Sequence, residues 1–432
     1  MYILNYIYFI ILTAIGYIWL TSKGGYMTNP LNRSQKMWLD GPERFWVLTF
    51  STGLVALSAP GVLDLMAIRL LALEVFCVIG LFLVDRKPVW SITGILYIIL
   101  IAWLLVGLFY TSAPDYGIRV IMKYIYPLLI MSFASAAVRD GEVFIKAGVW
   151  ARIVALLSLS ISVIPFLGKL APGVFWYVTA RAINYISICV FSLSLFYFTN
   201  ERKKNFLLSV LFIAPCLIWV FRTSIMGTAV ALMTFFFFKY RIKSLPFIAV
   251  IFIAGIIAVF TIPSLKEKMF NDDSITLEQF QNGEITKDDI NSNARFAMWE
   301  HLENRFYKEH KLTGSGTGSV QNYMYSNYIF GGLQVPHSDF VQMMCDNGLI
   351  ALILYLAMSL SAIIHSLVIY DRSHSGTLKI CAITAGSSMA GVLITLYSDN
   401  VVNYSMATLS MPFGFYGMAL GLWKAETLKY KL

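Results

Sequence analysis

Long apolar stretches recur along most of the chain, and a long polar stretch, residues 264–346, interrupts them. A helix of about 20 apolar residues crosses the hydrocarbon core of a bilayer. The pattern therefore predicts an all-α polytopic membrane protein, because a β-barrel would show short strands of alternating polarity instead. The candidate spans are 2–20, 45–58, 64–84, 91–110, 117–137, 143–165, 183–200, 206–221, 223–238, 244–263, 347–370, 379–399 and 405–423.

The second span is short and runs into Ser58-Ala59-Pro60, so the sequence predicts twelve or thirteen membrane helices. The first span lacks a basic leading segment and a small-residue cleavage site, which favours a retained helix over a signal peptide. We expect three parts: an N-terminal bundle of about ten spans (1–263), the long loop (264–346), and a C-terminal three-span bundle with a tail (347–432).

Basic residues gather in alternate loops between the spans. One set of loops holds nineteen Lys and Arg, whereas the opposite set, without the long loop, holds only Lys169, Arg181 and Arg222. Lys and Arg accumulate on the cytoplasmic side of membrane proteins. The C-terminus is therefore predicted to be cytoplasmic, and the 264–346 loop is predicted to face outward.

Composition agrees with this class. Hydrophobic residues make up 58% of the chain and charged residues 13%, against roughly 25% charged in soluble domains. The net charge of +9 lies in the short loops and does not indicate nucleic-acid binding. The five cysteines are scattered without metal-binding spacing, so no metal site or disulfide framework is predicted.

The long loop has its own character, with twelve acidic and seven basic residues. Residues 294–310 are predicted to form an amphipathic helix, because one face carries Phe296, Trp299, Leu302 and Phe306. The run Gly314-Ser315-Gly316-Thr317-Gly318 lacks the Gly-Lys-Ser/Thr ending of a phosphate-binding loop. We therefore interpret it as a flexible turn.

Several cations are predicted to face outward. Arg222 lies between two apolar spans, where a charge is costly and is usually partnered or functional. Arg119 and Lys123 are four residues apart and share a helix face. With Arg181 and Arg295, they could converge on an anionic head group, since guanidinium groups match phosphate oxygens. The alternative for each is a cation that reaches lipid phosphates at the membrane surface.

His337 is the best candidate for proton transfer. It follows Pro336, precedes Ser338 and Asp339, and lies just before the chain re-enters the membrane. Histidine exchanges a proton near neutral pH. The alternative is a loop histidine that only bonds to the backbone.

Four short motifs occur in a fixed order in the second half of the chain. They are Phe221-Arg222-Thr223-Ser224, the run Ala294-Arg295-Phe296-Ala297-Met298-Trp299, the glycine-rich turn, and Pro336-His337-Ser338-Asp339-Phe340 followed by Asp346-Asn347-Gly348-Leu349-Ile350. In order, spacing and outward placement, they resemble the O-antigen ligase and polymerase superfamily of bacterial polysaccharide assembly. The resemblance covers roughly residues 180–370.

The resemblance implies a GT-C-like glycosyltransferase of the bacterial inner membrane that needs no metal or cofactor and uses undecaprenyl-pyrophosphate-linked glycans. Arg222 and Arg295 would then bind the donor pyrophosphate and stabilise charge on the leaving group. His337 would orient or deprotonate the acceptor hydroxyl, and Arg181 resembles a further family arginine.

Two members of the superfamily and one unrelated class fit the sequence. A polymerase (Wzy-type) transfers the growing glycan to a new lipid-linked repeat unit, whereas a ligase transfers it to lipid A–core. The Pro-His-Ser-Asp-aromatic order favours the polymerase, with a chain-length regulator and a flippase as expected partners. A lipid-linked glycan flippase stays as the third alternative, although no repeated halves are evident.

Overall fold

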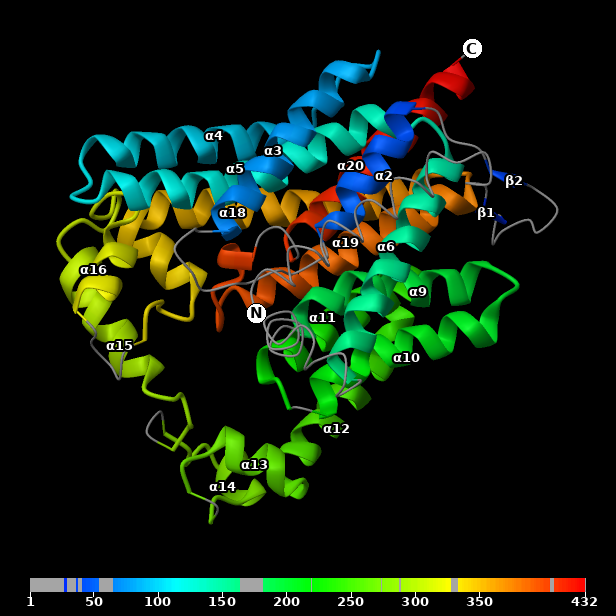
Figure 1. Cartoon of the computed structure of the whole chain (residues 1–432). Helices are drawn as coiled ribbons and strands as arrows, with labels where there is room; N and C mark the ends of the chain where they lie inside the picture. The colour runs from blue at the N-terminus through cyan, green and yellow to red at the C-terminus, as the bar shows by residue number, and fades with distance from the viewer. Residues whose placement is uncertain are drawn as a thin grey trace.

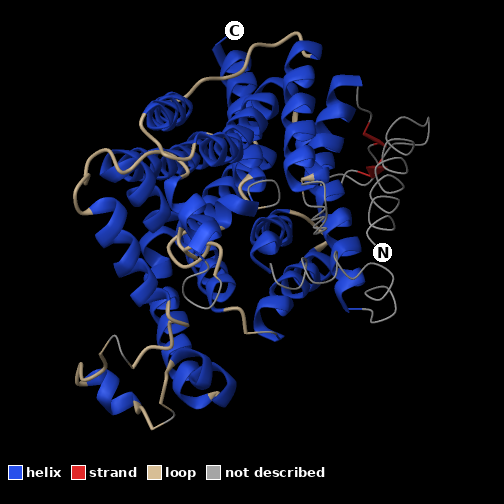
Figure 2. Cartoon of the chain, turned by 60° about the vertical axis from the view of Figure 1, so that its left-hand side comes forward, coloured by secondary structure: helices blue, strands red, loops and turns tan. Residues whose placement is uncertain are grey.

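The structure is a computed structural model of the whole chain, and it describes residues 27–28, 36–37, 41–53, 65–163, 182–218, 220–272, 274–286, 289–327, 333–404 and 408–431. Helices dominate these ranges (Figure 2). The exceptions are the antiparallel pair β1 (Met27–Thr28) and β2 (Lys36–Met37), and an isolated bridge between Phe270 and Ile290.

Each predicted span from 45–58 onward overlaps a helix, while the predicted span 2–20 and the ends of the spans 45–58 and 143–165 lie outside the described residues. The long helices are α2 (Gly41–Thr52), α3 (Leu65–Leu83), α4 (Ile92–Val106), α5 (Pro114–Ala137), α6 (Gly141–Val163), α9 (Ile186–Phe198), α10 (Arg202–Ile218), α11 (Arg222–Tyr240), α12 (Leu245–Thr261), α18 (Asp339–Arg372), α19 (Gly376–Thr395) and α20 (Ser410–Lys431). Local signals agree with these bounds: Ser91 and Ser375 cap α4 and α19 through their hydroxyl groups, and Pro114 begins α5.

Short helices form the polar loop and the connections. The loop contains α13 (Pro263–Met269), α14 (Leu277–Gln281), α15 (Arg295–Leu302), the π-helical turn η4 (Glu303–Tyr307) and α16 (Ser319–Asn327). The connections contain the 3-10 turns η1 (Gly107–Phe109), η2 (Ala182–Tyr185), η3 (Arg241–Ser244) and η5 (Val401–Tyr404).

Five helical stretches of the described chain are long and apolar enough to cross a membrane. They are Ile92–Phe109, Pro114–Ala137, Arg222–Thr261, Asp339–Arg372 and Gly376–Thr395. The third covers two predicted spans, because α11, η3 and α12 run on without a loop. The predicted class, an all-α polytopic membrane protein, is confirmed. The predicted division at residues 263 and 346 stays a prediction.

The helix α19 lies in the middle of the bundle and packs against α9, α11, α18 and α20 (Figure 1). Its crossing with α11 is close, because Gly391 and Gly227 face each other. A Cβ atom on Gly227 would lie 2.8 Å from the carbonyl oxygen of Gly391. Small residues allow such close backbone approach between membrane helices.

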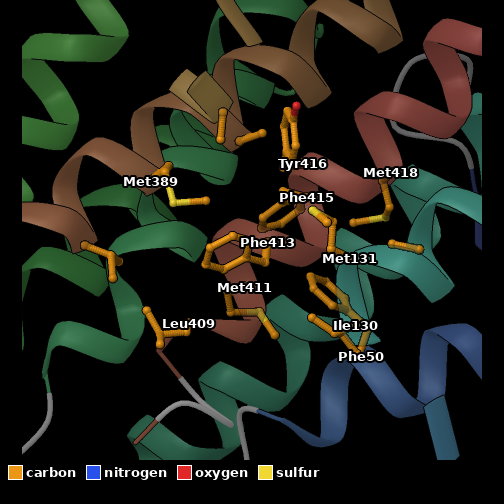
Figure 3. Packing of buried hydrophobic residues seen from close by; sticks show 14 of the residues in the cluster. Phe50, Ile130, Met131, Met389, Leu409, Met411, Phe413, Phe415, Tyr416 and Met418 are labelled. Atoms are coloured by element: carbon orange, nitrogen blue, oxygen red, sulfur yellow. The ribbon is translucent and has the colours of Figure 1, made fainter. Parts of the chain in front are cut away.

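The apolar core joins helices from both ends of the chain. Phe415 of α20 packs against Phe50 of α2 with ring centroids 5.3 Å apart, and Phe413 packs on Tyr97 of α4 at 5.2 Å; Met411 and Ile130 of α5 belong to the same cluster (Figure 3). By contrast, α12 has no buried residue, and its apolar side chains are exposed around the helix. It carries α13 and α14 at its far end, away from the bundle (Figures 1 and 2). An apolar surface of this kind is stable against lipid and unstable against water.

The long helix α18 is broken near its start. Gly348 has φ 73° and ψ −175°, so the helix divides into a short polar segment from Asp339 and a long apolar one. A side chain at Gly348 would collide with the carbonyl of Leu312, 2.1 Å from the position of a Cβ. Glycine tolerates this positive φ and this close contact.

Candidate functional site

Three sequence-predicted residues line one cavity of about 690 Å³: Arg222, Arg295 and His337. They come from the start of α11, the start of α15 and the turn before α18. The full lining also includes Ile183, Val220, Phe221, Thr223, Ser224, Glu267, Lys268, Asn291, Asn293 and Asp399. Because these segments are far apart in sequence, the cavity exists only in the folded chain.

Arg222 begins α11 and connects the bundle to the polar loop. Its Nη1 donates to the carbonyl oxygens of Lys268 and Asn291, the latter at 2.6 Å. Lys268 lies near the end of α13, and Asn291 lies where the chain returns to the cavity after α14. There the amide of Asn291 also donates to the carbonyl of Met269 at 2.9 Å. The guanidinium group therefore holds the two ends of the segment 268–291 beside the cavity.

Arg295 begins α15, after two residues with left-handed backbone, Asn293 (φ 50°) and Ala294 (φ 60°). Its Nη1 donates to the carbonyl oxygen of Ser398 at 2.7 Å. One turn later, the indole nitrogen of Trp299 donates to the carbonyl oxygen of Pro336 at 2.6 Å. The helix thus binds residues next to Asp399 and His337.

The apolar face predicted for this part of the loop is confirmed. Met298, Trp299 and Leu302 are buried in a small core with Val341 of α18, and Phe296 and Phe306 pack against it. The regular helix ends at Leu302 and continues as the π-helical turn. This core places α15 against the polar start of α18.

His337 and Asp399 form a pair at the cavity wall. The Nδ1 atom of His337 lies 3.6 Å from Oδ1 of Asp399, and it has no hydrogen-bond partner within the described residues. His337 has a left-handed backbone with φ 51°, which is unusual for a residue other than glycine. An imidazole whose Nδ1 faces a carboxylate has Nε2 as the other nitrogen that can exchange a proton with a substrate.

The residues after His337 fix its surroundings. Ser338 caps α18 by accepting from the amide of Val341 at 3.2 Å. The buried carboxylate of Asp339 accepts from the amide of Val402 at 3.0 Å and from Nδ2 of Asn400 at 3.2 Å. Its own amide donates to the carbonyl of Leu396 at 2.9 Å. Asp339 therefore ties the start of α18 to the turn that carries Asp399.

The glycine-rich turn forms a buried wedge between the α4–α5 connection and the break in α18. Its three glycines have positive φ, and a Cβ on Gly316 would lie 2.4 Å from Cα of Thr111. The amides of Gly318 and Val320 donate to the carboxylate of Asp346 at 3.1 and 2.8 Å. None of these five residues lines the cavity. The segment is a turn as predicted, but it is buried and closely packed, so its predicted flexibility is not observed.

The other predicted cations lie elsewhere or outside the description. Arg181 lies outside the described residues. Arg119 lies over the ring of Tyr116 at 5.8 Å, and Lys123 donates to Oδ1 of Asn403 at 2.6 Å. Neither is among the residues that line the cavity. Their role in substrate binding stays a prediction.

Asp272 and Asp289 of the polar loop accept hydrogen bonds from neighbouring residues. Asp272 accepts from the amide of Ser274 at 2.8 Å, and Asp289 accepts from the amide and hydroxyl of Thr286 at 2.7 Å. These backbone hydrogen bonds lower the pKa of both carboxyl groups. Within the described ranges, no cluster of three or more His, Cys, Asp or Glu is placed to hold a metal ion.

Residues 207–356 match the family model described as O-antigen ligase. Over this segment the chain is similar to the O-antigen ligase family. The segment contains Arg222, Arg295 and His337, while Asp399 lies beyond it. Members of that family are glycosyltransferase-like ligases and polymerases. No curated protein matches the chain.

The sequence motifs did not predict several residues of the cavity lining, among them Asp399, Lys268 and Glu267. The neighbouring Asn400 and Asn403 do not line the cavity. Asn400 instead binds Asp339, and Asn403 binds Lys123. The usable signal for Asp399 was a carboxylate at the outer end of an apolar span, on the same side as His337.

Proposed function

We propose that this protein polymerises undecaprenyl-pyrophosphate-linked oligosaccharide repeat units at the outer face of the bacterial inner membrane. It transfers the growing glycan from its lipid carrier to a new lipid-linked unit. One observation carries this proposal: Arg222, Arg295 and His337, from separate segments, line one cavity together with Asp399. Cations for a pyrophosphate and a base for a hydroxyl are the groups that such a transfer needs.

The reaction follows from the charges at the cavity wall. The acceptor hydroxyl oxygen attacks the anomeric carbon of the donor, and its proton passes to His337. A glycosidic bond forms while the bond from that carbon to the pyrophosphate oxygen breaks. Undecaprenyl pyrophosphate leaves with the bonding electrons, and Arg222 and Arg295 stabilise its added charge. Asp399 stabilises the imidazolium that His337 becomes.

The cavity offers more positive charge than the sequence motifs alone indicated. Lys268 lines it beside Arg222, on the segment that the Arg222 guanidinium binds. Each guanidinium has five N–H donors in a planar fork, a geometry that matches phosphate oxygens. The three cations together match the charge of a diphosphate better than that of a neutral sugar.

The second candidate is a ligase, because the matching family model is described as O-antigen ligase. Donor chemistry is the same in both reactions, and only the acceptor differs. The Pro336 to Phe340 sequence supports the polymerase. A deletion strain distinguishes the two: surface lipid capped with one repeat unit indicates a lost polymerase, and bare core with accumulated lipid-linked polymer indicates a lost ligase.

The membrane orientation is part of the proposal. The loop and cavity face outward and the C-terminus faces the cytoplasm, as the distribution of basic residues predicts. Reporter fusions after Asn282 and after Lys431 test this, with an outward signal expected only from the first.

A flippase and a chain-length regulator encoded beside this gene would agree with the polymerase. Glycan transfer by purified protein in detergent, without a sealed compartment, would contradict a flippase as the whole activity.

Alanine substitutions test the cavity residues directly. Arg222→Ala, Arg295→Ala and His337→Ala are each expected to abolish high-molecular-weight polysaccharide in a complemented deletion strain, while the protein stays in the membrane. Arg305→Ala and His310→Ala are matched controls, because both residues are exposed in the same loop and neither lines the cavity. Normal chain-length ladders from the three cavity variants would overturn the proposal.

A further inference from the structure

The helix α15 binds both halves of the His337–Asp399 pair. Arg295 donates to the carbonyl of Ser398, the residue before Asp399. Trp299 donates to the carbonyl of Pro336, the residue before His337. Residues four apart lie on the same face of a helix, so one short helix reaches both carbonyls.

The indole of Trp299 is held in place on every side. It is 8% exposed, and its ring packs against Phe296 and Tyr397 with ring centroids 5.6 Å apart in each case. Its N–H group therefore has a fixed direction, toward the carbonyl of Pro336. Tyr397 belongs to the same turn as Ser398 and Asp399, so the ring also contacts the other half of the pair.

His337 needs such support because its backbone is left-handed. Strained backbone conformations persist where the surrounding structure determines them. On one side Trp299 holds Pro336, and on the other Ser338 caps α18 while the amide of Asp339 binds Leu396. Without the indole hydrogen bond, the carbonyl of Pro336 would lose its buried donor and the peptide before His337 could rotate.

We propose that Trp299 is a positioning residue for His337, which it holds so that Nδ1 faces Asp399. This inference rests on the proposed function, in which His337 takes the proton of the acceptor hydroxyl. It gives the four-residue spacing between Arg295 and Trp299 a physical meaning. One residue binds the donor pyrophosphate and the other sets the base, so a single helix fixes the distance between them.

The test compares Trp299→Phe with Trp103→Phe in purified protein acting on lipid-linked glycan in detergent. Both variants keep an aromatic ring and lose one indole–carbonyl hydrogen bond, since Trp103 donates to the carbonyl of Asn347 at 2.9 Å, away from the cavity lining. Trp299→Phe is expected to lower kcat about tenfold, which is the effect of about 1.4 kcal/mol. Its KM for the donor stays within about twofold. Trp103→Phe is expected to keep kcat, with a similar or larger fall in Tm.

A double mutant separates positioning from general stability. If Trp299 acts through the His337–Asp399 pair, Trp299→Phe combined with Asp399→Asn lowers kcat little more than the stronger single substitution does. Multiplicative losses, an unchanged kcat for Trp299→Phe, or an equal loss in Trp103→Phe would overturn the inference. Full activity of His337→Gln would instead overturn the proposed function, so the two failures are distinguishable.

Discussion

Replacing Asp399 by asparagine removes the negative charge of the His337–Asp399 pair and keeps the size of the side chain. The pair matters most when His337 carries the acceptor proton. Two unit charges about 4 Å apart attract by about 4 kcal/mol at an effective dielectric constant near 20, and by about 1 kcal/mol in bulk water. The measured separation is 3.6 Å and each side chain is 26% exposed, so the pair lies between these limits.

A loss of about 2 kcal/mol of transition-state stabilisation corresponds to roughly a thirtyfold fall in kcat. The donor KM should change little, because neutral His337 in the ground state has no charge for Asp399 to stabilise. The assay follows transfer between purified lipid-linked glycans in detergent under saturating donor. Asp272→Asn is the control, since it makes the same chemical change at an exposed carboxylate of the long polar loop that does not line the cavity. A kcat within twofold of the native protein would refute the assignment of Asp399.

Two further predictions concern the loop. Lys268→Ala should raise the donor KM about two- to fivefold at low salt, because an exposed cation contributes up to about 1 kcal/mol of binding and is screened by salt. Steady-state kinetics at two ionic strengths check this, and an effect that does not depend on salt would contradict it. Gly316→Ala should destabilise the protein by about 3–5 kcal/mol, because a Cβ would strike Thr111 in addition to the cost of φ 100°. Gly283→Ala, with φ 70° and open space around it, should cost only about 1–2 kcal/mol, so equal shifts in thermal midpoint would contradict the steric argument.

The membrane helices could be predicted because twenty apolar residues in a row have few alternatives to a bilayer-spanning helix. Which helices pack in the core could not be predicted. The sequence of α12 is at least as apolar as that of the packed helix α19, yet no residue of α12 is buried. Hydropathy measures how unfavourable it is to expose a residue to water, and it does not tell whether the residue contacts lipid or protein.

The site divides in a similar way. Arg222, Arg295 and His337 could be found because each belongs to a short motif with ordered spacing. Asp399 and Lys268 belong to no such motif, and the folding of the turn after α19 and of α13 brings them to the cavity; the position of Asp399 at the end of an apolar span is a weaker signal. Arg119 and Lys123 show the limit of helix periodicity. Periodicity predicts that both residues lie on one helix face. Whether that face turns toward the cavity depends on the neighbouring helices, which the sequence does not identify.

The break at Gly348 divides α18 into two segments with different surroundings. The segment before it is held by polar contacts from Asp339 and Asp346, and the segment after it is an apolar helix that runs to Arg372. Membrane helices adjust to bilayer thickness by changing their tilt. At the break, the amide of Leu349 donates to the carbonyl of Lys311 at 2.8 Å, so the long segment is tied to the polar loop at its first residue. A change in the tilt of this segment would therefore reach the loop through that contact.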